Sequence, residues 1–498
     1  MLNKIISKYF KLGVMCSASL SMALVLTASV FGNSAYAAKK FSVSKSSITL
    51  YVKKSVNLKY TAPSAVTVKS SDSKAVKAEV KKNVITVKGV KSGNAVLKVK
   101  CGKKTKKIKV EVRNRVTNSV RDCINTSDKI NRFSCEMFNA LRNNKENTYI
   151  SPLSVYTAYA MVSNGAGGNT REQILKTLGI NNLEEFNSQI GSYIMHDKMS
   201  KSDSSEPGGV TYSVDNSLWI NTKSTLSANI DNAFITPLKQ YYNAEVFKNM
   251  NFDDSNTKDI INGWAAQKTN NNIKNMVDDI ASDDKALLLN TVYFKGRWLS
   301  PFNAKNTKKE TFNSVNGKKK VNMMSLKNGN FKHYKDGKLE GLELMYGDSY
   351  VMDILMSSDK SKTAGEVWEK LSVKKQEAAI KKFDKKGFSD IALLKLPCVD
   401  MEYKTNMIDV LRKMGIKDAF NAEADFSNIG DVYIRESIHK TRLVINEKGT
   451  ESSASTSVVM SKGDNTGKIK FIVDRPFICC IRNTSTGAVI FMGEINSL

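Results

Sequence analysis

The sequence predicts a small all-β sandwich followed by a larger unit that mixes helices and strands. Between about residues 38 and 113, short alternating polar and apolar segments are separated by Ser, Asn and Gly turns, which is the pattern of a small sandwich. Beyond residue 120, apolar residues recur at helical spacing, and strand-like segments follow later. With 498 residues, 41% of them hydrophobic and 25% charged, the chain is expected to hold two to four globular domains.

Residues 1–37 have the organisation of a secretory signal peptide. Three lysines precede an apolar run from Leu20 to Phe31, and the small-residue exit Ala35-Tyr36-Ala37 follows. We expect cleavage after Ala37 and export, so that the protein is secreted, extracellular or attached to the cell surface. The sequence offers no other segment of the length and apolarity of a transmembrane helix.

Residues 38–113 are predicted to form a separate lysine-rich domain. Alternating segments at 47–52, 84–87 and 107–112 are typical of strands. This pattern, with the turn Gly93-Asn94-Ala95-Val96-Leu97 leading into a late strand, resembles the bacterial immunoglobulin-like (Ig-like) modules of surface and secreted proteins. The resemblance implies a bacterial Ig-like domain.

The basicity of the chain belongs to this domain. It holds 20 lysines and three acids between residues 38 and 112, a net charge of +17, and the signal peptide adds +3, so that only about +8 of the formal charge of +28 remains for the 386 residues that follow. A field of this sign favours polyanions, and outside a cell an anionic cell-wall polymer is the expected partner. Nucleic acid is not expected, because only Phe41, Tyr51 and Tyr60 could stack on bases. The alternative is a solvated lysine-rich spacer.

Helices are predicted after residue 120. Apolar residues at 130, 133, 137 and 141 form one helical face, and Ser151 with Pro152 is placed to cap and begin a further helix that ends at the glycines 165–168. The segment Thr170-Arg171-Glu172-Gln173 has the spacing of a capping box for a short helix that ends near Gly179. Later, residues 286–294 predict a buried strand, and Asn290 within it needs hydrogen-bond partners.

A segment of small residues lies between two predicted strands, 441–446 and 469–473. If it became extended, Thr450, Ser452, Ala454, Thr456 and Val458 would share one small, uncharged face, with Glu451 on the other. The alternative is a Ser/Thr-rich linker between domains. Only about 30 residues follow the segment, too few for another domain.

Several ordered motifs together resemble the serpins, a family of serine protease inhibitors, over about residues 120–498. The residues that carry the resemblance are the loop start Glu447-Lys448-Gly449-Thr450-Glu451, the helix start Ile150-Ser151-Pro152-Leu153-Ser154, the strand Asn290 to Trp298, the segment Ser437-Ile438-His439-Lys440, and the closing segment Phe471 to Glu494. The resemblance implies an α+β fold for residues 114–498, with helices around a large mixed sheet and an exposed reactive loop.

The resemblance also implies a suicide-substrate inhibitor that traps a serine protease as an acyl-enzyme by inserting its cleaved loop into the sheet. The implied hinge residues are Glu447, Gly449, Thr450, Glu451, Ser452, Ala454 and Thr456. The implied shutter and breach residues, at which the sheet must part, are Ser151, Ser154, Asn290, His439 and Trp298. For the first four the alternative is a satisfied structural network, and for Trp298 it is plain core.

The bond that the protease would cut is expected near Gly463. In the family the scissile bond follows the residue about fourteen places beyond the hinge glycine, which places it between Gly463 and Asp464. The return segment to Pro476 is about two residues longer than usual, which leaves a cut after Lys462 open. A cut after Gly463 suits an elastase- or subtilisin-like enzyme, whereas a cut after Lys462 suits a trypsin-like one.

The sequence does not predict an enzyme, a cofactor or a metal site. It has three histidines without metal-like spacing and no Gly-x-Ser-x-Gly motif. Six cysteines lie outside the signal peptide and are interpreted mostly as buried thiols, with a Cys123–Cys135 disulfide left open. We expect a monomer. The main alternative function is a serpin fold that does not inhibit and serves in surface binding or adhesion.

Overall fold

The chain divides into two compact units, one ending at Arg115 and the other beginning at Val116. The signal peptide predicted at residues 1–37 lies outside the residues that the structure describes. The computed structural model describes residues 40–52, 54–81, 84–91, 93–113, 120–199, 209–223, 230–347, 349–450 and 469–498.

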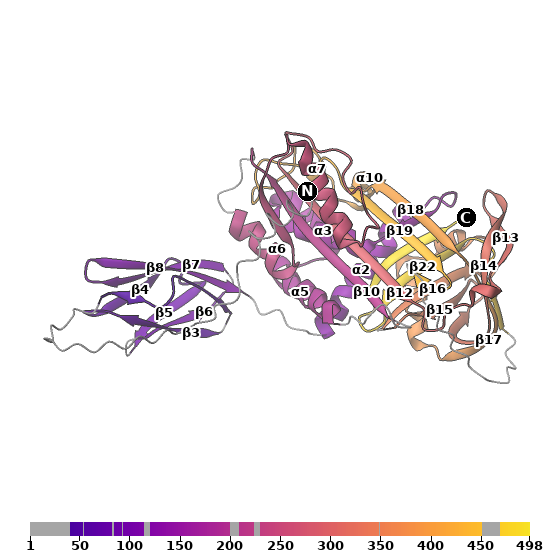
Figure 1. Ribbon diagram of the computed structural model, residues 1–498, viewed down its shortest axis with the longest axis horizontal. Helices are drawn as coiled ribbons and strands as arrows, with labels where there is room; N and C mark the ends of the chain where they lie inside the picture. The colour runs from indigo at the N-terminus through magenta and orange to yellow at the C-terminus, as the bar shows by residue number, and fades with distance from the viewer. Residues whose placement is uncertain are drawn as a thin grey trace, which may run out of the picture. The chain divides into compact units, whose positions relative to one another are not determined.

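The described part of the first unit consists of strands (Figure 1). They are β1 (Ser42–Val43), β2 (Ser47–Tyr51), β3 (Ser55–Thr61), β4 (Val66–Ser70), β5 (Val76–Lys81), β6 (Val84–Gly89), β7 (Gly93–Cys101) and β8 (Lys104–Arg113). One four-stranded sheet has the order β1-β3-β6-β5, and the other has the order β2-β8-β7-β4. One apolar cluster contains residues of both sheets, among them the fully buried Ile85, Leu97 and Ile108. Lysines occupy many of the alternate, exposed positions.

The second unit contains helices on both sides of a sheet. The helices are α2 (Val120–Leu141), α3 (Pro152–Gly165), α4 (Gly168–Leu178), α5 (Leu183–Met199), α6 (Thr236–Tyr241), α7 (Ser255–Lys268), α8 (Ala364–Trp368), α9 (Val373–Lys381) and α10 (Ile408–Met414). Short helical turns are η1 (Asp231–Ile235), η2 (Ala304–Asn306), η3 (Lys382–Lys385) and η4 (Asp418–Phe420). Within the described residues, no helix combines the length and apolarity needed to cross a bilayer.

The strands of the second unit form two sheets. The six-stranded sheet, in the order β11-β10-β12-β20-β19-β18, consists of β10 (Val210–Asn221), β11 (Glu245–Met250), β12 (Ala286–Arg297), β18 (Val399–Asn406), β19 (Ile438–Asn446) and β20 (Gly449–Thr450). The larger sheet consists of β9 (Thr148–Ile150), β13 (Lys308–Ser314), β14 (Gly317–Lys335), β15 (Leu339–Met345), β16 (Tyr350–Ser357), β17 (Phe388–Pro397), β21 (Ile469–Ile472), β22 (Phe477–Asn483) and β23 (Val489–Ile495).

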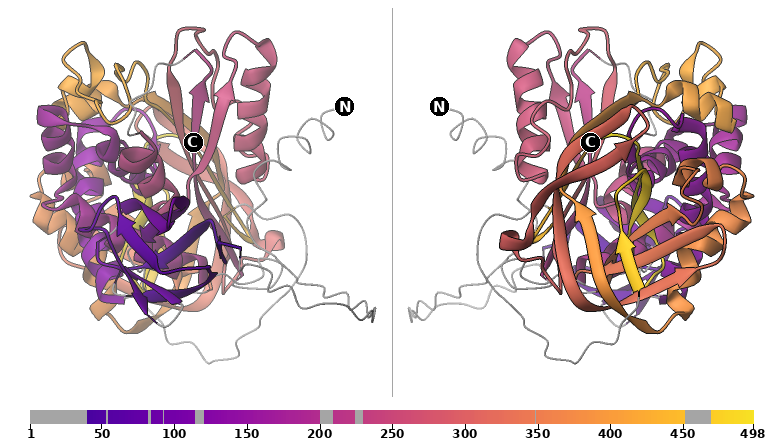
Figure 2. Two further views of the ribbon diagram at one scale, coloured as in Figure 1. Left: turned by 90° about the vertical axis from the view of Figure 1, so that its left-hand side faces the viewer. Right: turned by 90° about the vertical axis from the view of Figure 1, so that its right-hand side faces the viewer.

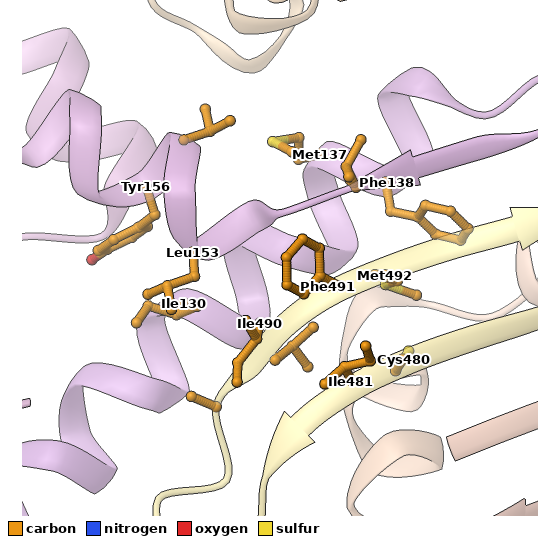
Figure 3. Packing of buried hydrophobic residues seen from close by; sticks show 14 of the residues in the cluster. Ile130, Met137, Phe138, Leu153, Tyr156, Cys480, Ile481, Ile490, Phe491 and Met492 are labelled. Atoms are coloured by element: carbon orange, nitrogen blue, oxygen red, sulfur yellow. The ribbon is translucent and has the colours of Figure 1, made fainter. Parts of the chain in front are cut away.

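Helix α3 lies in the centre of the larger core. Ser151 caps it as predicted, since its hydroxyl accepts a hydrogen bond from the Ser154 backbone N–H at 3.3 Å and Pro152 occupies the first turn. All of its residues except Ala158 are buried. Figure 3 shows Leu153 and Tyr156 of α3 packed near Ile490 of β23 and Ile130 of α2. Helix α3 is therefore buried in the core, where it contacts β12 and β23.

The predicted capping box at Thr170 is wrong. Helix α4 begins two residues earlier, at Gly168, and its N-cap Gly167 offers no side chain. A distant segment replaces the local cap, because the Gly167 backbone N–H donates to the Asp425 carbonyl at 2.8 Å and the Thr170 hydroxyl accepts from the Asp425 N–H at 2.9 Å. The predicted end is confirmed, since Gly179 adopts a left-handed conformation with φ 66°.

The six-stranded sheet is covered on two faces (Figure 2). Helix α3 contacts β12 from one face. On the other face, Trp264 of α7 packs in a cluster with Trp219 of β10 and Leu289 of β12. Side chains of β12 therefore alternate between two packed layers, as a strand's period of two requires.

The six cysteines among the described residues are free thiols, five of them buried and Cys398 partly exposed. A Cys123–Cys135 disulfide is excluded, because both residues belong to α2, in which twelve residues span about 18 Å.

Candidate functional site

The site is an open strand position in the six-stranded sheet. Strand β12 pairs along its length with β10, and β19 pairs along its length with β18. Between them stands β20, which pairs antiparallel with both neighbours through Gly449 and Thr450 alone. Within the described residues, no ladder joins β12 directly to β19. The sheet is thus continuous at one end and parted below it.

A cleft of about 620 Å³ occupies this part of the unit. Its walls come from the first halves of β12 and β19 and from the segments that precede these strands, and helix α3 contributes residues such as Ser154 and Tyr159. The predicted strand at 286–294 is confirmed, but it is buried only in part, since residues 286–288, 290 and 292 are only partly buried. Strand β12 lacks a neighbouring strand on this edge within the described residues, which leaves these side chains and backbone groups accessible from the cleft.

The predicted hinge residues that the structure describes lie in and next to β20, and specific contacts hold them there. Thr450 is 3% exposed, and its hydroxyl lies 2.6 Å from the Tyr346 hydroxyl. Gly449 has φ +150°, and a Cβ there would lie 2.0 Å from the Gly296 carbonyl oxygen, so only glycine fits between the strands. Glu447 accepts a hydrogen bond from the Thr307 hydroxyl at 2.7 Å. The segment therefore enters the sheet at a fixed residue.

Trp298 lies at the same end of the site. It is 1% exposed, its indole N–H donates to the Asn446 carbonyl at 2.9 Å, and its backbone N–H donates to the Lys448 carbonyl at 2.9 Å. Its ring stacks on Tyr346 with centroids 4.4 Å apart. Trp298 is therefore more than plain core, because it connects the end of β12 to the turn that leads into β20.

A polar cluster lies beneath the cleft. The Ser151 backbone N–H donates to His439 Nε2 at 3.0 Å, and the Ser151 hydroxyl donates to the Ile490 carbonyl at 2.8 Å. The Ser154 hydroxyl donates to the side-chain oxygen of Asn290. Ser154, Asn290 and His439 all line the cleft. The structure thus brings the four predicted shutter residues together. Ser151 and Ser154 lie at the start of α3, Asn290 lies on β12, and His439 lies on β19.

Sequence reasoning missed two members of the site, Asn216 and Tyr346. Asn216 of β10 is 1% exposed, accepts a hydrogen bond from the Asn290 side chain and donates to the Tyr242 carbonyl at 2.8 Å. The sequence gives no signal for it, because Asn216 lies between Asp215 and Ser217 in a strand with several polar residues. Tyr346 carried no local signal, because its role depends on a contact with Thr450 across 104 residues.

Burial governs the protonation of His439. The side chain is 5% exposed, and desolvation lowers its pKa from the ordinary 6.5 to about 4. The imidazole is therefore neutral at pH 7. Since Nε2 accepts the Ser151 N–H, the remaining ring proton is on Nδ1. Within the described residues, no group of three or more potential metal ligands occurs.

The rest of the predicted loop lies outside the described residues. This applies to the hinge residues Glu451, Ser452, Ala454 and Thr456 and to the scissile-bond candidates Lys462, Gly463 and Asp464.

The fold and the parted sheet define the class of protein. The family model described as Serpin (serine protease inhibitor) matches residues 128–498. The chain belongs to the serpin family.

Individual relatives agree with this assignment. An uncharacterised serpin-like protein of Thermococcus kodakarensis is 30% identical, with 74% of this chain and 84% of that protein covered. Iripin-2 of Ixodes ricinus is 31% identical, with 74% and 92% covered. Among solved structures, the thermophilic serpin tengpin in its native state is similar with a TM-score of 0.65 and 28% identity, covering 74% of this chain and 93% of that chain.

Proposed function

We propose that this protein inhibits a serine protease as a suicide substrate, by inserting its cleaved loop between β12 and β19. The observation that carries the proposal is the open strand position, whose first two places are already filled by Gly449 and Thr450. A loop that starts in register needs no new nucleation to continue as a strand.

The register of β20 fixes where each further loop residue would lie. Thr450 pairs with Gly296 on one side and with Ile445 on the other. Extending both antiparallel ladders by one residue at a time reaches Ala286, the first residue of β12, at Met460. The resulting strand of eleven residues would span about 36 Å. The inward-facing residues would meet these partners: Ser452 with Phe294 and Leu443, Ala454 with Val292 and Thr441, and Thr456 with Asn290 and His439.

This register explains the small side chains of the loop. Leu443, Thr441 and His439 are all buried, so their partners Ser452, Ala454 and Thr456 would face the same packed layer. Residues of helix α3, among them Ser154 and Ala158, line the cleft on that side. Thr456 would reach the polar cluster last, and its hydroxyl could hydrogen-bond there.

The chemical steps that precede loop insertion would be those of the protease. The serine hydroxyl of the protease attacks the scissile carbonyl, an ester forms, and the peptide bond breaks to release the new amino terminus. Insertion of the loop would then carry the acylated protease away from the cut end before water hydrolyses the ester. The inhibitor is consumed, because the ester bond and the inserted strand remain.

The first test mixes the full-length protein with trypsin-, elastase- and subtilisin-like enzymes. We expect a complex that survives SDS with at least one of them, together with a released C-terminal peptide. Sequencing that peptide locates the cut. A start at Asp464 agrees with the expected bond, a start at Gly463 indicates a cut after Lys462, and a start before Ser461 contradicts both. Cleavage by every enzyme without a covalent complex would reject the inhibitory mechanism.

A non-inhibitory serpin that acts in surface binding or adhesion is the second candidate. The basic first unit favours a surface role, but the hinge does not favour loss of inhibition. Thr450 is the described hinge residue that faces inward, and it is small and already buried in the sheet. Residues 452, 454 and 456 are Ser, Ala and Thr, none of which would obstruct insertion.

We further propose that the protein is secreted and that its first unit is a bacterial Ig-like domain that holds it to an anionic cell-wall polymer. The signal-like residues 1–37 support export, and the paired four-stranded sheets with a common apolar cluster support the domain. The density of lysine supports the partner.

A chain that starts at Asn114 tests whether the two units act independently. It should trap protease at an unchanged rate, because β12, β19 and the hinge all lie in the second unit. It should bind anionic cell-wall preparations less than the intact protein, whose binding should fall as salt is raised. If truncation abolishes trapping, then the units are not independent.

A further inference from the structure

Three lysines stand directly side by side on the sheet β2-β8-β7-β4. The register pairs Lys69 of β4 with Lys98 of β7, and Lys98 with Lys107 of β8. All three side chains are exposed. Directly opposite residues of an antiparallel pair have Cβ atoms about 5 Å apart, so the row places three like charges within about 10 Å.

The same face extends the charge in both directions. Lys100 lies two residues beyond Lys98 on β7, and Lys109 lies two residues beyond Lys107 on β8, so both point to the same side as the row. The nearest acid on this face is Glu111, opposite Asn94 at the far end of the ladder. No ion pair to any of the five lysines is found among the described residues.

The other sheet of this unit is built differently. Lys77 and Lys88 also stand opposite each other, but the next outward row contains Glu79, which forms an ion pair with Lys81 at 2.9 Å. Like charges directly opposite destabilise a sheet, and nearby acids relieve that repulsion. The row of Lys69, Lys98 and Lys107 lacks this relief, and an external polyanion would supply it.

The side chains also indicate the chemistry of the ligand. The row and its flanks consist of lysines, which act as point charges toward phosphate, whereas arginine suits bidentate recognition of planar groups. The one arginine of strands β4, β7 and β8 is Arg113, the last residue of β8, six residues beyond Lys107. Strands β4, β7 and β8 contain no aromatic residue on which a base could stack, and Tyr51 of the neighbouring β2 pairs with Arg113 at the end of β8, away from the row. The lysine row would therefore bind a ligand through its charge, without stacking on bases.

We infer that the row Lys69–Lys98–Lys107, flanked by Lys100 and Lys109, is the binding site for a linear polyol-phosphate polymer. This inference rests on the proposed anchoring role of the first unit and names its contact face and ligand class. The phosphodiester chain lies across the three strands and replaces the missing acids of the face.

The test measures binding of full-length protein to poly(glycerol phosphate) as a function of salt. Substituting all three residues of the row, Lys69→Gln, Lys98→Gln and Lys107→Gln, should weaken binding about a hundredfold at low salt and reduce the salt slope by about 3. The matched control substitutes Lys59, Lys77 and Lys88 of the other sheet by Gln, which removes the same net charge. The control should lose less than tenfold.

A second measurement separates binding from folding. Removing like charges that repel should raise the thermal midpoint of the row variant at low salt, so weaker binding cannot be attributed to unfolding. Equal losses in the row variant and the control would keep the anchoring role but overturn the contact face. Failure of the parent to bind poly(glycerol phosphate) would overturn the anchoring role itself. Equally tight binding of single-stranded DNA or polyglutamate would overturn the ligand class.

Discussion

With the proposed mechanism, replacing Thr450 by arginine should give a protein that proteases cleave as a substrate but do not remain bound to. Thr450 is buried between β12 and β19, and its hydroxyl contacts only the hydroxyl of Tyr346 there. No carboxylate approaches Thr450 in the described contacts, so an inserted guanidinium would be an unpaired buried charge. Such a charge costs about 3 kcal/mol or more, which should keep residue 450 out of the sheet in the intact protein. Insertion after cleavage must then bury the charge, so it slows on the order of a hundredfold.

Slower insertion changes the outcome because it competes with hydrolysis of the acyl-enzyme. The variant should give far less SDS-resistant complex per protease, while the loop is cut at the same bond. Densitometry of complex and cleaved inhibitor over a series of molar ratios measures the partition between the two products. Complex formation equal to that of the parent would show that the strand does not insert from residue 450.

Glu451→Arg is the matched control. It introduces the same side chain one residue later, at a position that is already charged and that would face the opposite side of an inserted strand. This variant should trap protease as the parent does. Thr450→Ser adds a second control, since it retains the hydroxyl toward Tyr346 and should retain most of the activity.

The sequence predicted those parts of the site that depend on local chemistry. Ser151 and Pro152 announce the start of α3 because capping is decided within one helical turn. The start of α4 was missed because its cap comes from Asp425, more than 250 residues away. Asn216 and Tyr346 were missed for the same reason, since their partners belong to other elements.

The parted sheet was also beyond a local reading. Residues 286–294 have the apolar run of a strand packed on all sides, and nothing in that run shows that one edge lacks a neighbour within the described residues. Periodicity reports which face of a strand is apolar, but not which edge is paired. The family resemblance, by contrast, predicted that Asn290 and His439 belong to one site, at which the sheet would part to admit the loop.

His439→Gln should remove a specific loss of stability in mild acid. In the folded chain the pKa of His439 is lowered to about 4 by burial, whereas in the unfolded chain it is about 6.5. Between pH 6.5 and pH 4, His439 therefore binds a proton in the unfolded chain but not in the folded chain. Stability from this group is unchanged above pH 6.5 and falls as pH drops toward 4, by about 2 kcal/mol at pH 5 and on the order of 3 kcal/mol in total.

Protonation would also break the polar cluster, because a charged imidazole has no acceptor left for the Ser151 N–H. Gln keeps an acceptor near the position of Nε2 and does not titrate. Urea unfolding between pH 8 and pH 4.5 measures the free energy of unfolding of parent and variant. Both chains contain the same carboxylates, so the difference between the two values reports His439. At pH 8 the imidazole is neutral in both states, so any offset there reports packing alone. Parallel stability curves from pH 8 to pH 4.5 would show that protonation of His439 does not cause the loss of stability in acid.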